Sequence, residues 1–159
     1  MTALRSSLPL TLASVLFFVA CAPAPPPVQK TQQPPPDSTK EAWYEPAVRE
    51  LAGLNRDAAS LLKSGMKDDA AAVLTKAQPI TVRLLAASQP TLAAMEAASD
   101  HDQMYAEMLL ANRNFGWARL EFQKNVSRWK NWKPQTEETA RRLELARAGI
   151  RECDQRITE

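Results

Sequence analysis

AASLLKSGMKDDAAAVL, residues 58–74, and AEMLLANRNFGWARLEF, residues 106–122, are two stretches of this chain that carry the same apolar pattern 48 positions apart. The positions that coincide are small or large apolar residues: Ala58 with Ala106, Leu61 with Leu109, Leu62 with Leu110, Ala70 with Ala118, and Leu74 with Phe122. Small residues let two antiparallel helices approach, and the large residues beside them fill the remaining space. The pattern predicts two helical hairpins.

The residues before the first stretch continue its helical pattern. Five apolar residues recur at spacings of 4, 3, 4 and 3, which is one face of a helix: Ala47, Leu51, Leu54, Ala58 and Leu61. We expect this helix to begin near Pro46, since proline is tolerated in a first turn, and to stop before Gly65. Upstream, Ser38 and Glu41 match a capping box.

Prolines and acidic residues divide the rest of the chain into further helices. A second helix is predicted from about Lys67, with a kink or break at Pro79 before the pattern resumes to about Ser88. Pro90 opens a short helix, to about Ala98. Asp100 and Asp102 are interpreted as residues at the start of a third long helix, about 101–113, with His101 exposed. A fourth helix is predicted over about 116–129.

The last predicted helix follows Thr136 and carries a sustained apolar stripe. Its members are spaced 3, 4, 3 and 4 apart, with charges elsewhere: Leu143, Ala146, Ile150, Cys153 and Ile157. This is expected of a capping helix, and Cys153 is interpreted as a small core residue. Since no alternating strand pattern occurs, the predicted fold class is all-α.

The helix pairs resemble the tetratricopeptide repeat, and the best match is FGWARLEFQK at residues 115–124. The chain departs from that family in its period of 48 positions instead of about 34, in Arg113 at the place of Gly65, and in Asn125 at the place of Ala77. The resemblance implies about two irregular antiparallel hairpins plus a C-terminal capping helix over residues 46–157. It also implies binding of peptides or other subunits on concave helix faces. An irregular helical bundle is the competing fold.

Residues 1–20 are interpreted as a signal peptide. The segment from Leu8 to Ala20 is an uncharged run that is too short to span a bilayer as a helix. The run ends in Phe18-Val19-Ala20-Cys21, which resembles the lipobox of bacterial lipoproteins. That resemblance implies lipidation of Cys21, and Ala22 after it points to the outer membrane. A conventional signal or an uncleaved anchor, followed by an ordinary Cys21, is the alternative.

Residues 21–37 then form a predicted disordered tether. Between Ala22 and Asp37 nearly every second residue is proline, and such a segment cannot bury a core. Proline favours an extended spacer, which leaves residues 38–159 as the helical domain.

One cluster stands out as a candidate partner surface: Arg128, Trp129, Lys130, Trp132 and Lys133. Trp and Arg are common interface anchors, and basic residues beside Trp suit a glycan, an anionic lipid or an acidic protein. The alternative is that Trp117 and Trp129 pack between helices while the basic residues stay solvated.

Other chemistry finds little support in the sequence. The only histidine is His101, so a Ser-His-Asp triad or a metal site with several histidines is not expected, and no cofactor is implied. The formal net charge of +2 does not indicate a nucleic-acid binder.

These observations predict a non-enzymatic, lipid-anchored interaction protein of the bacterial cell envelope. We expect it on the outer membrane with its domain facing the periplasm, bound to a protein or peptide partner. The alternative is a structural lipoprotein that binds peptidoglycan or anionic lipid through the Trp-basic cluster. The oligomeric state is left open.

Overall fold

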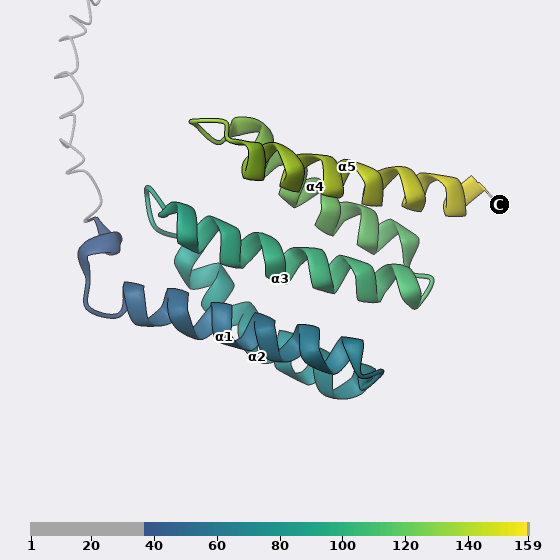
Figure 1. Ribbon diagram of the computed structural model, residues 1–159, viewed down its shortest axis with the longest axis horizontal. Helices are drawn as coiled ribbons and strands as arrows, with labels where there is room; N and C mark the ends of the chain where they lie inside the picture. Colours follow the sequence, from purple (N-terminus) through teal and green to yellow (C-terminus); the bar gives the residue numbers. More distant parts are fainter. Residues whose placement is uncertain (1–36, 159) are drawn as a thin grey trace, which may run out of the picture. The chain divides into compact units, whose positions relative to one another are not determined.

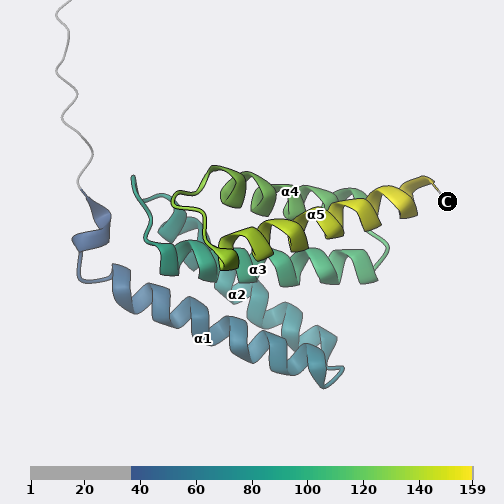
Figure 2. The same ribbon diagram turned by 45° about the horizontal axis from the view of Figure 1, so that its top comes forward.

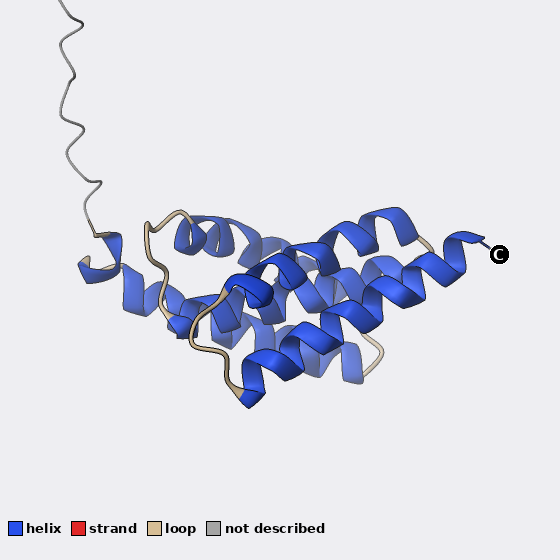
Figure 3. Ribbon diagram, turned by 90° about the horizontal axis from the view of Figure 1, so that it is seen from above, coloured by secondary structure: helices blue, strands red, loops and turns tan. Residues whose placement is uncertain are grey.

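Five α-helices follow one short 3-10 helix in residues 37–158, the part of the chain that the computed structural model describes (Figure 1). The elements are η1 (Ser38–Lys40), α1 (Tyr44–Lys63), α2 (Lys67–Leu85), α3 (Leu92–Ala111), α4 (Phe115–Asn131) and α5 (Glu137–Thr158). No strand occurs among these residues, as Figure 3 shows, so the predicted all-α class is confirmed. The predicted signal peptide, Cys21 and the tether up to residue 36 lie outside the described residues.

The helices are arranged in two layers. In Figure 1, α1, α3 and α5 lie in front and run toward the same end, while α2 and α4 lie behind them and run back. Each α-helix packs against the next one in sequence, and α1 also packs against α3. Figure 2 shows the same arrangement turned toward the viewer, with α4 and α5 side by side.

The helix pairs α1–α2 and α3–α4 have corresponding boundaries. The helices α1 and α3 each contain 20 residues and begin at Tyr44 and Leu92, while α2 and α4 begin at Lys67 and Phe115. The start of α1 is separated from the start of α3 by the offset that relates Ala58 to Ala106, and the same offset separates α2 from α4. The similar apolar patterns therefore accompany helices that start and turn at equivalent positions.

The two turns share one hydrogen-bond geometry. Gly65 and Arg113 both have positive φ, 77° and 61°. The N–H of the following residue donates back to the carbonyl of a leucine, from Met66 to Leu61 at 2.9 Å and from Asn114 to Leu109 at 2.8 Å. This is a Schellman motif, which satisfies carbonyls that a helix end would leave unpaired.

The start of the folded part differs from the prediction. The helix α1 begins at Tyr44, and Pro46 lies in its first turn as expected. The predicted capping box of Ser38 and Glu41 is wrong. Asp37 caps η1 instead, because its carboxylate accepts a hydrogen bond from the N–H of Thr39 at 3.2 Å, and Glu41 ends that short helix.

Two predicted helix boundaries are also wrong. The helix α2 continues through Pro79, whose side chain is exposed, since Ala77, Thr81 and Leu84 are buried on both sides of it. The predicted short helix to Ala98 and the helix from His101 are one helix, α3, capped by Thr91. Its acidic residues lie in mid-helix because partners from other helices pair with them, as described below.

The interior contains two apolar clusters with polar residues between them. Tyr44, Val48, Leu51 and Leu84 are among the buried members of the first cluster. Ala106, Ala118, Phe122 and Cys153 form the second. Cys153 is fully buried, as predicted, and burial raises the pKa of its thiol.

The helix α5 closes the fold against α4. Thr136 and Thr139 cap its start reciprocally, each hydroxyl accepting the backbone N–H of the other, at 3.2 and 2.8 Å. Gly149 faces the ring of Phe122, and a Cβ at Gly149 would lie 2.6 Å from ring carbons. The glycine therefore permits close packing of α5 on α4. Along the predicted stripe, Ala146 and Cys153 are buried, but Ile157 is exposed.

Candidate functional site

Three cavities open along one stripe of α3, and together we call them the α3 groove. The stripe consists of residues spaced 3, 1, 3 and 4 apart: Asp100, Gln103, Met104, Glu107 and Ala111. The cavities measure about 370 Å³ between α1 and α3, about 180 Å³ at the C-terminal ends of these helices, and about 680 Å³ toward α5. From Asp100 to Ala111 a helix rises by about 17 Å, so the groove is elongated.

The wall on α1 is built from small and polar residues. Ala52, Asn55, Arg56 and Ala59 line the first cavity. Asn55 is only 5% exposed, and its Nδ2 donates to the carbonyl of Ala97 at 2.7 Å. Its Oδ1 is the buried side-chain oxygen that has no hydrogen-bond partner in the described part of the chain. A buried amide oxygen without a donor is costly, and this one lies on a residue that lines the first cavity.

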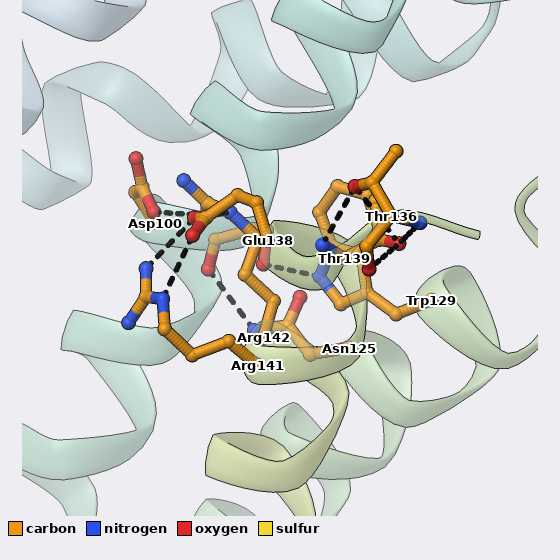
Figure 4. A network of polar contacts seen from close by, with 9 residues as sticks. Asp100, Asn125, Trp129, Thr136, Glu138, Thr139, Arg141 and Arg142 are labelled. Atoms are coloured by element: carbon orange, nitrogen blue, oxygen red, sulfur yellow. Dashed lines mark hydrogen bonds and ion pairs between the residues drawn. The ribbon is translucent and has the colours of Figure 1, made fainter. Parts of the chain in front are cut away.

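One ion pair ties α5 to this region of α3, and two more lie within α5 beside it. Arg142 donates to Asp100 at 2.5 Å and to Glu138 at 2.7 Å (Figure 4). Glu138 also accepts two hydrogen bonds from Arg141. The hydrogen bond from Arg141 and the positive charges of both arginines lower the pKa of Glu138 to about 2. The carboxylate therefore stays ionised and keeps the two arginines oriented.

Behind the groove, α3 and α4 share a buried polar layer made of Ser99, His101, Asp102, Asn125, Arg128 and Trp129. Trp129 Nε1 donates to the hydroxyl of Ser99 at 2.8 Å, and Asn125 Nδ2 donates to the carbonyl of Ser99 at 3.0 Å. Arg128 donates to Asn125 and, at 2.8 Å, to Asp102. The contacts with Ser99 and Asp102 join α4 to one turn of α3, whereas the contact between Arg128 and Asn125 lies within α4.

The carboxylate of Asp102 is the charged centre of this layer. Burial opposes its ionisation, but the hydrogen bond with His101 and the charge of Arg128 outweigh burial and lower its pKa. His101 is 1% exposed, with Nδ1 3.3 Å from Asp102 and Nε2 3.1 Å from the carbonyl oxygen of Leu74. The expectations that His101 is exposed and that Asp102 starts a helix are therefore wrong, because both are held by contacts between helices.

The structure does not place the predicted Trp-basic cluster on one surface. Trp129 is fully buried, and the Arg128 side chain is 6% exposed in its ion pair with Asp102. Lys130 and Lys133 are exposed, and Trp132 is half-buried against Trp129. The cluster fails as a single surface because a helix turns successive residues in different directions, which sends Arg128 and Trp129 into the core. Partner binding by the other three residues stays a prediction.

The two tryptophans expected to pack between helices differ in burial. Trp129 fills the core, whereas Trp117 is 67% exposed on α4. Cys21, for which lipidation is predicted, lies outside the described residues.

The single histidine lies in contact with other protein groups. Both ring nitrogens of His101 face protein oxygens, so neither is available to a reacting group outside the layer. No group of three or more His, Cys, Asp or Glu side chains able to hold a metal occurs among residues 37–158. None of the helices described is both long and apolar enough to cross a membrane.

The sequence pattern does not predict the α3 groove, although Asp100 and Arg113 are named in it for other reasons. The available signal was the spacing of Ala52, Asn55, Arg56 and Ala59, a face of α1 adjacent to its core face. Small residues on an otherwise polar helix face leave room for a ligand, but the pattern does not show which helix lies opposite. Comparison with family models, curated proteins and solved structures gives no match, so the function is argued from the chain itself.

Proposed function

We propose that this protein is a lipid-anchored binding module of the bacterial cell envelope that holds an extended segment of a partner protein in the α3 groove. The observation that carries the proposal is the groove itself, a row of three cavities along about 17 Å of α3. An extended chain rises by about 3.3 Å per residue, so the row accommodates about five residues. Ordinary ligand pockets are more enclosed than this row.

The mixed lining of the groove supports a peptide ligand, because polar groups lie beside apolar side chains along its length. Asn55 Oδ1 lacks a donor among the described residues. The backbone N–H groups of an extended peptide are hydrogen-bond donors whatever side chains the peptide carries. Met104, Met108 and Leu110 supply apolar contacts along the same length of α3.

The tetratricopeptide resemblance is part of the same proposal. That resemblance implies binding on a face formed by several helices, and here the α3 groove is lined by α1, α3 and α5. The long repeat period and the capping role of α5 make this an irregular, two-hairpin version. The outer membrane is proposed from the lipobox resemblance at Cys21 and from Ala22, and the domain is proposed to face the periplasm.

The test is selection of peptides on the full-length protein in detergent, followed by binding to two matched variants. Ala59→Trp puts an indole into the first cavity, whereas Ala72→Trp makes the same change on the exposed surface of α2 outside the groove. We expect selected peptides to bind Ala59→Trp about tenfold more weakly and Ala72→Trp unchanged. Circular dichroism checks that both variants keep the wild-type helix content.

Two results would contradict the proposal. One is the recovery of no peptide above background in the selection. The other is a set of selected peptides whose affinity is the same for wild type and Ala59→Trp, because such peptides bind elsewhere.

A further inference from the structure

Among the described residues, each cavity of the α3 groove contains one cation without an ionic partner. Arg56 lines the first cavity, Lys67 the second and Arg113 the third. Within residues 37–158, none of these three side chains takes part in an ion pair or a side-chain hydrogen bond. Most other arginines of the domain have a carboxylate partner. Arg56 and Arg113 differ from them because they have none among the described residues and because both line the groove.

The carboxylates of the groove are already engaged. Asp100 is paired with Arg142 at 2.5 Å, and Glu152 lies 4.0 Å from Arg156. Glu107 accepts a hydrogen bond from Gln103 at 2.8 Å. The unpaired charge along the groove is therefore mainly positive, and it is spread over its length.

Arg113 adds a separate indication. Its φ of 61° lies in the left-handed region, where the corresponding position of the first hairpin is Gly65. Glycine suits that backbone at no steric cost, whereas arginine does not. The turn itself does not require a side chain at this position, and the side chain present contributes the free cation of the largest groove cavity.

On the basis of the proposed function, we propose that the partner segment held in the α3 groove is acidic, with carboxylates that meet Arg56, Lys67 and Arg113 in turn. Its apolar side chains contact Met104 and Leu110 between these cations. Charge complementarity of this kind selects the partner and speeds its association more than it raises affinity.

The composition of the selected peptides tests this inference directly. From a random pool of short peptides, we expect Asp and Glu to be enriched about twofold or more over the unselected pool, and Lys and Arg to be depleted. Binding of the selected peptides should weaken between about 0.05 M and about 0.5 M salt, because exposed charges are screened over that range.

Charge reversals locate the effect. Arg56→Glu, Lys67→Glu and Arg113→Glu are each expected to weaken binding about three- to tenfold. Lys76→Glu is the matched control, since Lys76 is an exposed cation of α2 outside the groove, and binding should stay within about twofold. Arg113→Glu keeps a non-glycine residue in the turn, so it does not alter the backbone preference.

The outcomes separate this inference from the function on which it rests. Neutral or basic peptides that Ala59→Trp weakens would overturn the acidic partner and leave the peptide groove standing. Acidic peptides that bind the three reversal variants as well as wild type would also overturn it. If Ala59→Trp leaves the affinity of the selected peptides unchanged, both proposals are contradicted.

Discussion

At the scale of single residues, the two turns show how one backbone geometry is met by different side chains. Gly65 and Arg113 occupy the same place in the two Schellman motifs, with φ of 77° and 61°. A non-glycine residue in the left-handed region costs roughly 1–2 kcal/mol, and glycine loses more entropy on folding. The difference between the residues is therefore a small and measurable stability effect.

We expect Gly65→Ala to lower the free energy of unfolding by about 1 kcal/mol, because a Cβ there meets no atom within 4 Å and only the backbone is strained. Arg113→Gly should raise it by about 0.5 kcal/mol, since relief of strain exceeds the entropy lost. Urea unfolding measures both. Equal effects of the same sign would contradict the interpretation.

Asp102 links stability to pH. Its pKa is lower in the folded protein than the ordinary aspartate value of 3.8, so the folded state binds fewer protons. Its contribution is therefore complete above the unfolded pKa and is lost as the pH falls through the folded pKa.

Asp102→Asn is expected to lower the free energy of unfolding at neutral pH by about 3 kcal/mol, because Arg128 loses its buried counterion. The gap between wild type and variant should narrow as the pH falls below 3.8, where wild type loses the same charge. Urea unfolding from about pH 7 to about pH 2 measures this gap. A gap that is constant over this range would show that the charge of Asp102 is not responsible.

At the scale of elements, the second hairpin has polar residues where the first has apolar ones. When the two hairpins are aligned by their apolar patterns, Asp102 and Arg128 correspond to Leu54 and Ile80, which pack against the first apolar cluster. At equivalent positions, α3 and α4 therefore carry an ion pair, whereas α1 and α2 carry apolar side chains. Directed hydrogen bonds fix the register of α3 and α4 more narrowly than apolar contact does.

This correspondence predicts the outcome of an exchange. Asp102→Leu alone leaves Arg128 buried without a counterion, whereas Asp102→Leu with Arg128→Ile copies the first hairpin. We expect the double variant to be more stable than the single variant by about 2 kcal/mol in urea unfolding. If the second change made the protein less stable than Asp102→Leu alone, the two positions would not be coupled as a pair.

At the scale of the whole molecule, the proposed anchor and groove act together. The lipid at Cys21 would hold the chain at the membrane, residues 22–37 would act as a spacer, and the helical domain would present the groove. One acyl chain gives only marginal membrane binding, so stable attachment requires the several chains that the lipobox resemblance implies.

We expect Cys21→Ala to move the full-length protein from the membrane fraction to the soluble fraction and to abolish labelling by a radioactive fatty acid. A pull-down from membranes with wild type as bait and Cys21→Ala as control should then yield a small set of envelope proteins. Retention of Cys21→Ala in the membrane fraction would contradict lipid anchoring. Recovery of only glycan or lipid, lost at high salt, would favour the alternative of a structural lipoprotein.

The helices and their turns could be predicted because their determinants are local. The apolar spacing around Leu51 and Leu61 and the glycine at position 65 lie within a few positions of the structure they produce. No break occurs at Pro79, where a kink or break was predicted, or between Ala98 and His101, and the reason is the opposite one. Local signals favoured interruption, but packing on both sides of Pro79 and partners from α4 and α5 kept α2 and α3 continuous.

The sequence by itself thus determined the all-α class, the positions of the two hairpin turns and the buried Cys153, since periodicity and capping depend on neighbours along the chain. Only the tertiary structure decided that Trp129 is buried while Trp117 is exposed, that His101 and Asp102 lie inside, and that Arg56, Lys67 and Arg113 line one groove. Burial and charge pairing depend on which helix lies opposite. No pattern within a single helix contains that information.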